Sequence, residues 1–300
     1  MGTAPTVGRL APTPSGHLHL GNVVAFAAAW LSVRSASGRL LLRLEDVDRI
    51  RSRTDVIDSI RDDLRWMGLL WDEEVLPQRL RDYAPWLDRL RAHTYACTCT
   101  RKQIGAAGGV YPGTCRDAGH TEGAIRFALP QGEVPVVDRR FGIRRVDPNT
   151  FGDPVLRRRD GVYTYNLAVV ADDLLDGVTE VVRGADLLDY TAVQIHLWRA
   201  LGATQPTWLH APLILGPDGR KLSKSTASTE IRALRAMGWT PGELWRTVLP
   251  WLGLPPLDHI HDAIDSYDPA RSLPGPIALE DPPDRPARRR PTSRGWPSPR

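Results

Sequence analysis

Strand-like and helix-like segments alternate over residues 7–68, and this alternation limits the folds that the chain can adopt. Residues 7–12 and 39–45 resemble short strands. Residues 20–35 are rich in Ala, Val and Leu, and residues 54–68 place apolar side chains on one side of a helix. This order is typical of a parallel sheet with crossover helices. The sequence therefore predicts an α/β fold with a doubly wound, Rossmann-type parallel sheet.

The alternation breaks at residues 95–120, which hold all three cysteines and several glycines. We expect a small inserted module there. From about residue 162 the pattern resumes, with residues 167–171 predicted as a buried strand, 186–201 as a helix and 208–215 as a strand. The second half of the chain is thus expected to complete the sheet that the first half begins.

Two short helices are expected after residue 225. The second has a clear start at Thr240, with a hydroxyl cap, a proline in the first turn and Glu243 three residues on. Beyond about residue 255 the chain is rich in proline and arginine and has little apolar content to offset the entropy of ordering. We expect that part to stay without fixed structure.

The net charge of +4 comes from the end of the chain. Residues 285–300 carry six arginines and no acidic residue, so residues 1–284 have a net charge of −2. A nucleic acid would therefore have to bind a local basic surface or the tail, because no global positive field attracts it.

The composition also indicates where in the cell the protein is expected. The sequence has no run of about 18 apolar residues and no secretion-signal pattern at its start. Three cysteines close together in the sequence argue against a disulfide framework. We expect a cytoplasmic monomer that does not bind a membrane.

The segment from Arg9 to Asn22 carries the first chemical signal. A strand ends, a glycine-containing turn follows, and a helix is predicted to begin just after His19. Free N–H groups and the positive dipole end at a helix start suit a phosphate, and Gly21 would permit its close approach. His19 could then stabilise charge that builds on a reacting phosphate. The alternative is that His19 only caps the helix or lies on the surface.

The second signal is the distribution of lysine. The chain has 36 arginines and three lysines, and two of these, Lys221 and Lys224, lie in one short segment. Two compact ammonium groups with hydroxyls between them can grip a triphosphate and follow the departing pyrophosphate. The alternative is an ordinary solvated basic loop.

Together, in this order, the two segments resemble the His-Ile-Gly-His and Lys-Met-Ser-Lys-Ser signatures of class I aminoacyl-tRNA synthetases. Residues 9–21, 43–49, 165–173 and 177–184 are similar to the glutamyl branch of that family, and the likeness covers roughly residues 7–254. Two positions depart from the pattern: Asn22 replaces the second signature histidine, and Val169 stands where full-length glutamyl enzymes often have asparagine.

The resemblance implies three groups of site residues. The glutamate-binding residues would be Arg9, Leu10, Ala11, Pro12, Thr13, Glu45, Tyr165 and Arg183. The ATP-binding residues would be His19, Gly21, Asn22, Lys221, Ser223 and Lys224, with His19, Lys221 and Lys224 catalytic. Arg9 and Arg183 would each take a carboxylate through a two-pronged contact, and Glu45 would pair with the ammonium. A surface ion-pair cluster around residues 43–49 is the alternative.

The three cysteines suggest a metal site. Three thiolates and one further donor would close a tetrahedral zinc site, whereas free core cysteines are the alternative. The resemblance assigns a structural zinc ion to Cys97, Cys99, Tyr111 and Cys115. Phenol is a poor ligand at neutral pH, so His93 or His120 could replace Tyr111.

The expected divisions follow from these segments. They are residues 1–94 as the first half of the catalytic domain, 95–160 as an inserted connecting module with the zinc site, 161–232 as the second half, 233–255 as a short helical segment, and 256–300 as the Pro/Arg-rich tail.

About 30 foldable residues follow the lysine segment, where full-length glutamyl enzymes have an anticodon-binding half. The chain therefore resembles the shorter glutamyl-queuosine tRNA(Asp) synthetases. That resemblance implies activation of L-glutamate by ATP and Mg²⁺ without tRNA, then transfer to the queuosine base in the anticodon of tRNA(Asp). The alternatives are an enzyme that charges a tRNA 3′ end, a ligase acting on a small molecule, and a non-catalytic binding protein.

Overall fold

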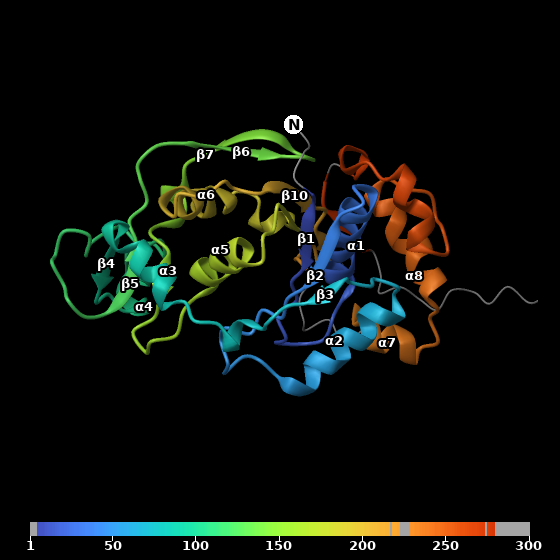
Figure 1. Ribbon diagram of the computed structural model, residues 1–300, viewed down its shortest axis with the longest axis horizontal. Helices are drawn as coiled ribbons and strands as arrows, with labels where there is room; N and C mark the ends of the chain where they lie inside the picture. Colours follow the sequence, from blue (N-terminus) through green and yellow to red (C-terminus); the bar gives the residue numbers. More distant parts are fainter. Residues whose placement is uncertain (1–4, 217, 223–228, 274, 280–300) are drawn as a thin grey trace, which may run out of the picture.

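The computed structural model describes residues 5–216, 218–222, 229–273 and 275–279. The chain forms an elongated molecule in which the inserted module lies at one end and helix α8 (Pro241–Val248) lies near the other (Figure 1). The sheet that carries the two halves of the α/β pattern lies between them.

The central sheet is built from both halves of the chain. Strands β1 (Val7–Leu10), β2 (Arg39–Leu42) and β3 (Glu73–Glu74) pair in parallel, and so do β9 (Glu180–Gly184), β10 (Thr207–Ala211) and β6 (Val134–Asp138). The antiparallel strand β7 (Gly142–Val146) closes one edge. The two groups meet where the Thr179 amide donates to the Val7 carbonyl at 2.9 Å. The strand order is therefore 3-2-1-9-10-6-7.

Both faces of this sheet are covered. Along β2, Leu40 and Leu42 pack into one apolar core with helix α1 (Leu20–Ser35), whereas Leu41 packs into a second core with α5 (Tyr165–Leu175) and α6 (Thr191–Ala200). Successive side chains of a strand point to opposite faces, so the continuous leucine run reflects burial on both sides. The predicted doubly wound α/β fold is confirmed.

The remaining helices flank these layers. Helix α2 (Thr54–Trp66) contributes to the α1 core, and α3 (Ala84–Arg89) lies beside α5. Single-turn 3₁₀ segments connect the elements. They are η1 (Gln78–Leu80), η2 (Arg91–His93), η3 (Pro148–Phe151) and η4 (Ala185–Leu187).

The inserted module has its own small sheet. Strands β4 (Thr94–Cys97), β5 (Ala124–Phe127) and β8 (Val155–Arg157) pair antiparallel, with helix α4 (Arg101–Ala106) beside them. The cysteines lie at the end of β4 and in the loop before β5.

The predicted strand at residues 167–171 is wrong, because these residues lie inside helix α5. All five are buried, and a fully buried helix segment has the same continuous apolar pattern as a buried strand. The helix expected at 186–201 forms as η4 followed by α6, and the strand expected at 208–215 forms as β10 and β11 (Ile214–Leu215).

The two short helices after the lysine segment are α7 (Ile231–Ala236) and α8, and the predicted cap of α8 is confirmed. The Glu243 amide donates to the Thr240 hydroxyl at 3.3 Å, and the Thr240 amide donates to the Glu243 carboxylate at 2.7 Å. This reciprocal pair satisfies two amides at the helix start.

The expectation of no fixed structure beyond about residue 255 is wrong for the described residues up to 279. Segments η6 (Leu249–Leu252), η7 (Ile260–Ser266) and η8 (Pro269–Arg271) follow α8, and β12 (Ile277–Ala278) pairs with β11. Ile260, Ala263 and Ile277 join the α1 core, so few apolar residues suffice where an existing core receives them. Residues 280–300, with the arginine run, lie outside the described residues.

Among the described residues α1 is the longest helix, and no described helix combines the length and apolar character that crossing a membrane requires.

Candidate active site

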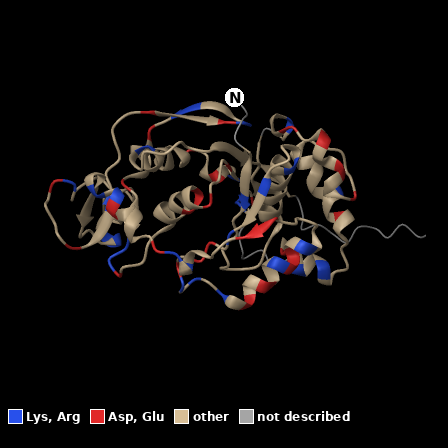
Figure 2. Cartoon of the chain, in the orientation of Figure 1, with Lys and Arg blue, Asp and Glu red and all other residues tan. Residues whose placement is uncertain are grey.

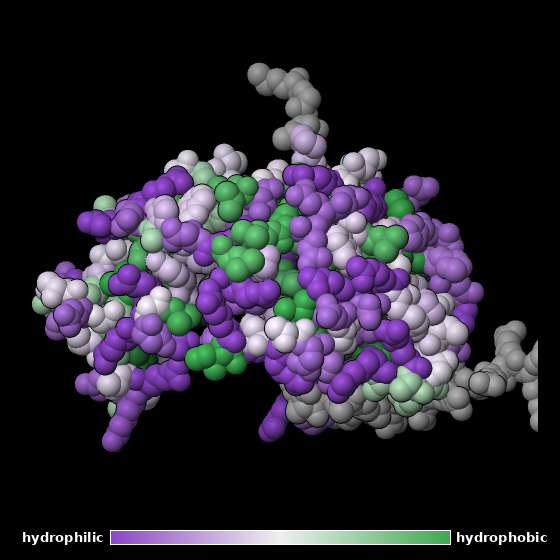
Figure 3. Space-filling view, turned by 60° about the horizontal axis from the view of Figure 1, so that its bottom comes forward, coloured by the Kyte–Doolittle hydropathy of each residue, from purple (hydrophilic) through white to green (hydrophobic). Residues whose placement is uncertain are grey.

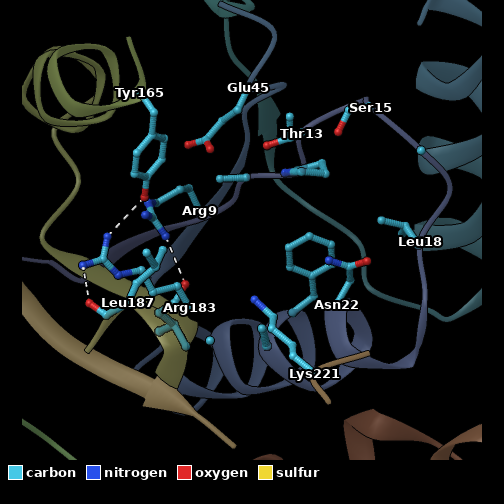
Figure 4. Close-up of a pocket in the computed structure, with 17 residues that line it drawn as sticks. Arg9, Thr13, Ser15, Leu18, Asn22, Glu45, Tyr165, Arg183, Leu187 and Lys221 are labelled. Carbon is cyan, nitrogen blue, oxygen red and sulfur yellow. Dashed lines mark hydrogen bonds between the residues drawn. The ribbon is translucent and has the colours of Figure 1, made fainter. Parts of the chain in front are cut away.

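A cavity of about 390 Å³ opens where β1 and β9 end and α1 begins (Figure 4). It brings together side chains that are far apart in the sequence, as expected at the carboxyl edge of an open α/β sheet. The predicted site residues that line it are Arg9, Ala11, Pro12, Thr13, Asn22, Glu45, Tyr165, Arg183 and Lys221.

Other predicted residues lie elsewhere. Leu10 is fully buried and does not line the cavity. His19 and Gly21 line a smaller neighbouring cavity of about 130 Å³, which shares Asn22 and Lys221 with the first. Ser223 and Lys224 lie outside the described residues.

Eight lining residues were not predicted: Ser15, Gly16, Leu18, Ala25, Phe26, Val182, Gly184 and Leu187. Helical spacing could have revealed two of them, because Ala25 and Phe26 follow Asn22 at positions i+3 and i+4 and so share its face of α1. Val182 and Gly184 flank Arg183 at the end of β9.

The start of α1 is organised by His19. Its backbone is extended, its Nδ1 accepts from the Gly21 amide at 3.1 Å, and its own amide donates to the Asn22 side chain at 3.1 Å. Because Nδ1 accepts, the neutral ring carries its proton on Nε2. A Cβ atom on Gly21 would lie 3.0 Å from the His19 ring, so glycine lets the ring fold over the helix start. His19 therefore caps the helix, and the cap fixes its ring beside the cavities.

Arg183 is buried, and protein acceptors surround its guanidinium. Its donors meet His210 Nε2 at 3.1 Å, Tyr165 Oη at 3.2 Å, Gln194 Oε1 at 2.7 Å, Thr191 Oγ1 at 2.8 Å and the Leu187 carbonyl at 3.4 Å. These partners account for all five N–H groups, so none is left for the expected two-pronged contact. Because Tyr165 Oη accepts from Arg183, its own proton is free to point into the cavity (Figure 4).

His210 helps to hold the Arg183 side chain in place. Its Nδ1 lies 2.7 Å from an Asp138 carboxylate oxygen, and both side chains are fully buried. Burial lowers the pKa of His210, against the opposing effect of Asp138. A neutral ring that donates from Nδ1 leaves Nε2 as the acceptor for Arg183.

A buried ion network lies under Glu45. The Arg43 side chain is completely buried and lies 2.7 Å from Asp173, 3.0 Å from Asp176, 3.4 Å from Glu45 and 4.0 Å from Asp172. Arg9 pairs with Asp173 at 3.1 Å, and Arg81 pairs with Asp172 and Asp176 at 3.1 and 2.9 Å. The network thus contains three guanidinium groups and four carboxylates. The alternative of a surface ion-pair cluster around residues 43–49 is therefore wrong for Arg43, Glu45 and Asp46, which are buried.

Glu45 occupies the exposed end of that network. Burial raises its pKa, while Arg43 and Arg9 act in the opposite direction. Asp173, held between the same two arginines, has a lowered pKa despite its burial. The carboxylate that faces the cavity therefore has a less favourable environment for its charge than Asp173, which lies deeper in the same network.

Lys221 lies across the cavity from Glu45 and Tyr165 (Figure 4), and it lines both cavities. Its Nζ contacts the Asp186 carboxylate on η4, and about half of the side chain is exposed. A half-exposed ammonium can exchange this partner for a ligand at low cost.

The cysteines form a compact group in the inserted module. The sulfur atoms of Cys97, Cys99 and Cys115 lie within 4.8 Å of one another, and no other described group of three His, Cys, Asp or Glu ligand atoms lies as close together. Neither His93 nor His120 belongs to it. The Tyr111 hydroxyl accepts from the Cys115 amide at 2.8 Å. The sulfur set fits a tetrahedral zinc ion with one position left for a fourth donor.

The thiol of Cys115 is already biased toward the thiolate. Burial opposes its ionisation, but hydrogen bonds from the Thr98 backbone and from Tyr111, Cys99 and Cys97 lower its pKa to about 6. Burial raises the pKa of Tyr111. Burial also raises the pKa of Cys99, to about 11, so Cys115 ionises more readily than Cys99 or Tyr111.

The doubly wound sheet has an insertion between its halves, a histidine caps the helix at the strand ends, and a lysine lines the cavities at the start of that helix. These features are those of a class I aminoacyl-tRNA synthetase catalytic domain. The sequence profile "tRNA synthetases class I (E and Q), catalytic domain" matches residues 6–108 and 115–267. The chain belongs to this family and is an ATP-dependent ligase.

Two curated relatives agree with that placement, and one solved structure shares the fold. Glutamyl-Q tRNA(Asp) synthetase from Pseudomonas aeruginosa is 46% identical over 256 residues, which cover 80% of this chain and 87% of the relative. The protein of that name from Pseudomonas putida is 48% identical over 249 residues, covering 77% and 83%. The crystal structure of glutamate-tRNA synthetase from Elizabethkingia anophelis superposes with a TM-score of 0.80 at 24% identity, covering 92% of this chain and 68% of that one.

Proposed function

We propose that this chain activates L-glutamate with ATP, without needing tRNA, and transfers the glutamyl group to queuosine in the anticodon of tRNA(Asp). The observation that carries the proposal is the single cavity that joins Arg9, Glu45 and Tyr165 to the start of α1 and to Lys221. The printed names of relatives 46–48% identical support the choice of amino acid and acceptor.

Glutamate fits the charges of the cavity. The buried network has one more carboxylate than guanidinium groups, and an uncompensated buried charge is costly. The ammonium group of the substrate would balance that negative charge when it binds Glu45. Arg9 uses Nε on Asp173 and Nη1 on the Val182 carbonyl, which leaves Nη2 for a substrate carboxylate. The Tyr165 hydroxyl donates to the same substrate. Leu10 is buried beneath the site and supports it, while Ala11, Pro12 and Thr13 line the cavity.

ATP binds beside the glutamate, across the start of α1. His19, Gly21 and Asn22 would line the phosphate site at the helix start, and Lys221, Ser223 and Lys224 would hold the β- and γ-phosphates with Mg²⁺. The α-carboxylate oxygen of glutamate bonds to the α-phosphorus, and the bond from that phosphorus to pyrophosphate breaks. Positioning and charge stabilisation supply most of the rate, so no strong base is required.

The defining experiment separates activation from transfer. We expect glutamate-dependent ATP–pyrophosphate exchange without tRNA, and labelling of tRNA(Asp) by labelled glutamate only when the tRNA contains queuosine. Aspartate and glutamine serve as controls for amino-acid choice. Labelling that persists in queuosine-free tRNA would refute the acceptor, and exchange that requires tRNA would refute independent activation.

We further propose that Cys97, Cys99, Cys115 and Tyr111 hold one structural zinc ion. The sulfur spacing supports the first three ligands, and the position of the Tyr111 hydroxyl beside Cys115 supports the fourth. When bound, the zinc ion cross-links β4 to the loop before β5.

This site predicts a metal dependence of stability. We expect one zinc ion per chain by elemental analysis, and loss of that ion with a lower melting temperature in Cys99→Ser, because the ion binds only the folded module. Tyr111→Phe is expected to retain zinc more weakly. A zinc content in Cys99→Ser equal to that of the unaltered protein would contradict the site.

A further inference from the structure

A second cavity, of about 340 Å³, adjoins the cavity just described. The two share Thr13, Ser15, Glu45 and Tyr165, which we call the common wall. The rest of the second cavity is formed by residues 47, 48, 51 and 52 before α2, by Arg158 and residues 163–164 after β8, by Gln78 on η1 and by Arg101 at the start of α4. It therefore lies between the catalytic core and the inserted module, and its volume is within the ~300–1,000 Å³ typical of ligand sites.

Three arginines, Arg51, Arg101 and Arg158, and two acidic residues, Glu45 and Asp48, line this second cavity. Arg51 and Arg158 share one carboxylate, Asp48, at 3.6 and 3.1 Å, and Arg158 also contacts Asp160. Arg101 is exposed and forms no ion pair with any residue in the described part of the chain. Arg101 has its guanidinium available, and Arg51 and Arg158 share the single carboxylate of Asp48. These guanidinium groups suit an anionic ligand such as a phosphodiester backbone.

The surface around the opening is also hydrophilic. The stretch before α2 and the loop after β8 carry basic residues along the lower edge of the molecule (Figure 2). The face beneath them is mostly polar, and its outline is notched between the inserted module and the core (Figure 3). A large polyanion can therefore approach this side.

An aromatic ring faces the same cavity. Tyr163 and Tyr165 both line it, because Thr164 between them is extended and places them on one side of the chain. The Tyr163 ring packs against Tyr83 with 5.6 Å between ring centroids, which fixes its orientation. A fixed tyrosine face beside arginines is the usual arrangement for stacking an unpaired base.

We propose that the second cavity receives the acceptor nucleotide of an RNA, with phosphates on Arg51, Arg101 and Arg158 and the base against Tyr163. The proposal rests on the proposed function and assigns its acceptor site. At the common wall, the acceptor hydroxyl oxygen bonds to the carbonyl carbon of glutamyl adenylate. The bond from that carbon to the phosphate oxygen breaks, and AMP leaves with the electron pair and accepts the hydroxyl proton on its phosphate.

The test compares Arg101→Ala with Lys102→Ala, a neighbouring exposed cation that lines neither cavity. We expect the KM for queuosine-containing tRNA(Asp) to rise about tenfold in Arg101→Ala, as loss of one charge-assisted contact implies. The slope of log affinity against log salt should fall by about 0.7. Lys102→Ala should change neither quantity. Equal values in the two variants would overturn the acceptor site.

Tyr163 gives an independent test of the base contact. Tyr163→Leu should raise the same KM about tenfold through loss of stacking, and Tyr163→Phe should restore it because the ring remains. If Tyr163→Phe fails to restore it, base stacking is refuted. Lack of tRNA-free exchange in the unaltered protein would instead refute the proposed function, so the two failures are distinguishable.

Discussion

Replacing Lys221 by alanine should lower the rate of glutamate-dependent ATP–pyrophosphate exchange by about 10²–10³-fold, the usual effect of removing one preorganised charge from a transition state. The side chain lines both the glutamate cavity and the small cavity at the helix start. Its ammonium needs only to leave Asp186 to meet a phosphate. The same direction is expected for Lys224→Ala, although that residue lies outside the described part of the chain.

The only other lysine of the chain, Lys102, provides the control for these lysine substitutions. Lys102→Ala removes the third lysine, which lies in the inserted module and lines neither of these cavities. It should leave exchange unchanged. Because Lys221 is about half exposed, its replacement should not alter the melting temperature, which separates a catalytic loss from misfolding. Exchange in Lys221→Ala within twofold of the unaltered protein would remove the residue from the proposed phosphate site.

Periodicity accounts for what could be predicted of the fold. The first two strands and two helices follow from apolar patterns that the structure confirms. The failure at residues 167–171 has the same origin, because a segment buried on all sides loses the polar face that distinguishes a helix from a strand. The two aspartates that follow, Asp172 and Asp173, are themselves buried in the ion network, so even their charge did not mark a solvent face.

The position of the site could be predicted better than its contacts. Residues at strand ends meet at one edge of the sheet, so the sequence pattern is enough to place Arg9 and Glu45 together, whereas Arg183 is placed by the family resemblance because the sequence pattern predicts no strand at residues 180–184. The use of each donor could not be predicted. Arg183 is saturated by groups on α6 and β10, and that pairing depends on how those elements pack. The sequence therefore predicts a second carboxylate clamp where the structure holds a support for Tyr165.

The buried ion network under Glu45 predicts a large loss of stability in Arg43→Met. The side chain is wholly buried and faces four carboxylates, so its removal leaves negative charge without compensation. Breaking a buried ion pair from one side costs about 3–5 kcal/mol, and we expect the free energy of unfolding in urea to fall by about that amount. The matched control is Arg39→Met on β2, whose exposed pair with Glu73 at 3.0 Å should contribute less than about 1 kcal/mol.

A second substitution identifies the cause of that loss. If uncompensated charge destabilises Arg43→Met, then adding Asp176→Asn should recover part of the stability, because one of the stranded carboxylates becomes neutral. If only lost packing were responsible, the two changes would be additive and the double variant would be less stable still. Stability of Arg43→Met equal to that of Arg39→Met would show that the network does not hold the site together. Glu45 would then owe its position to the strand end alone.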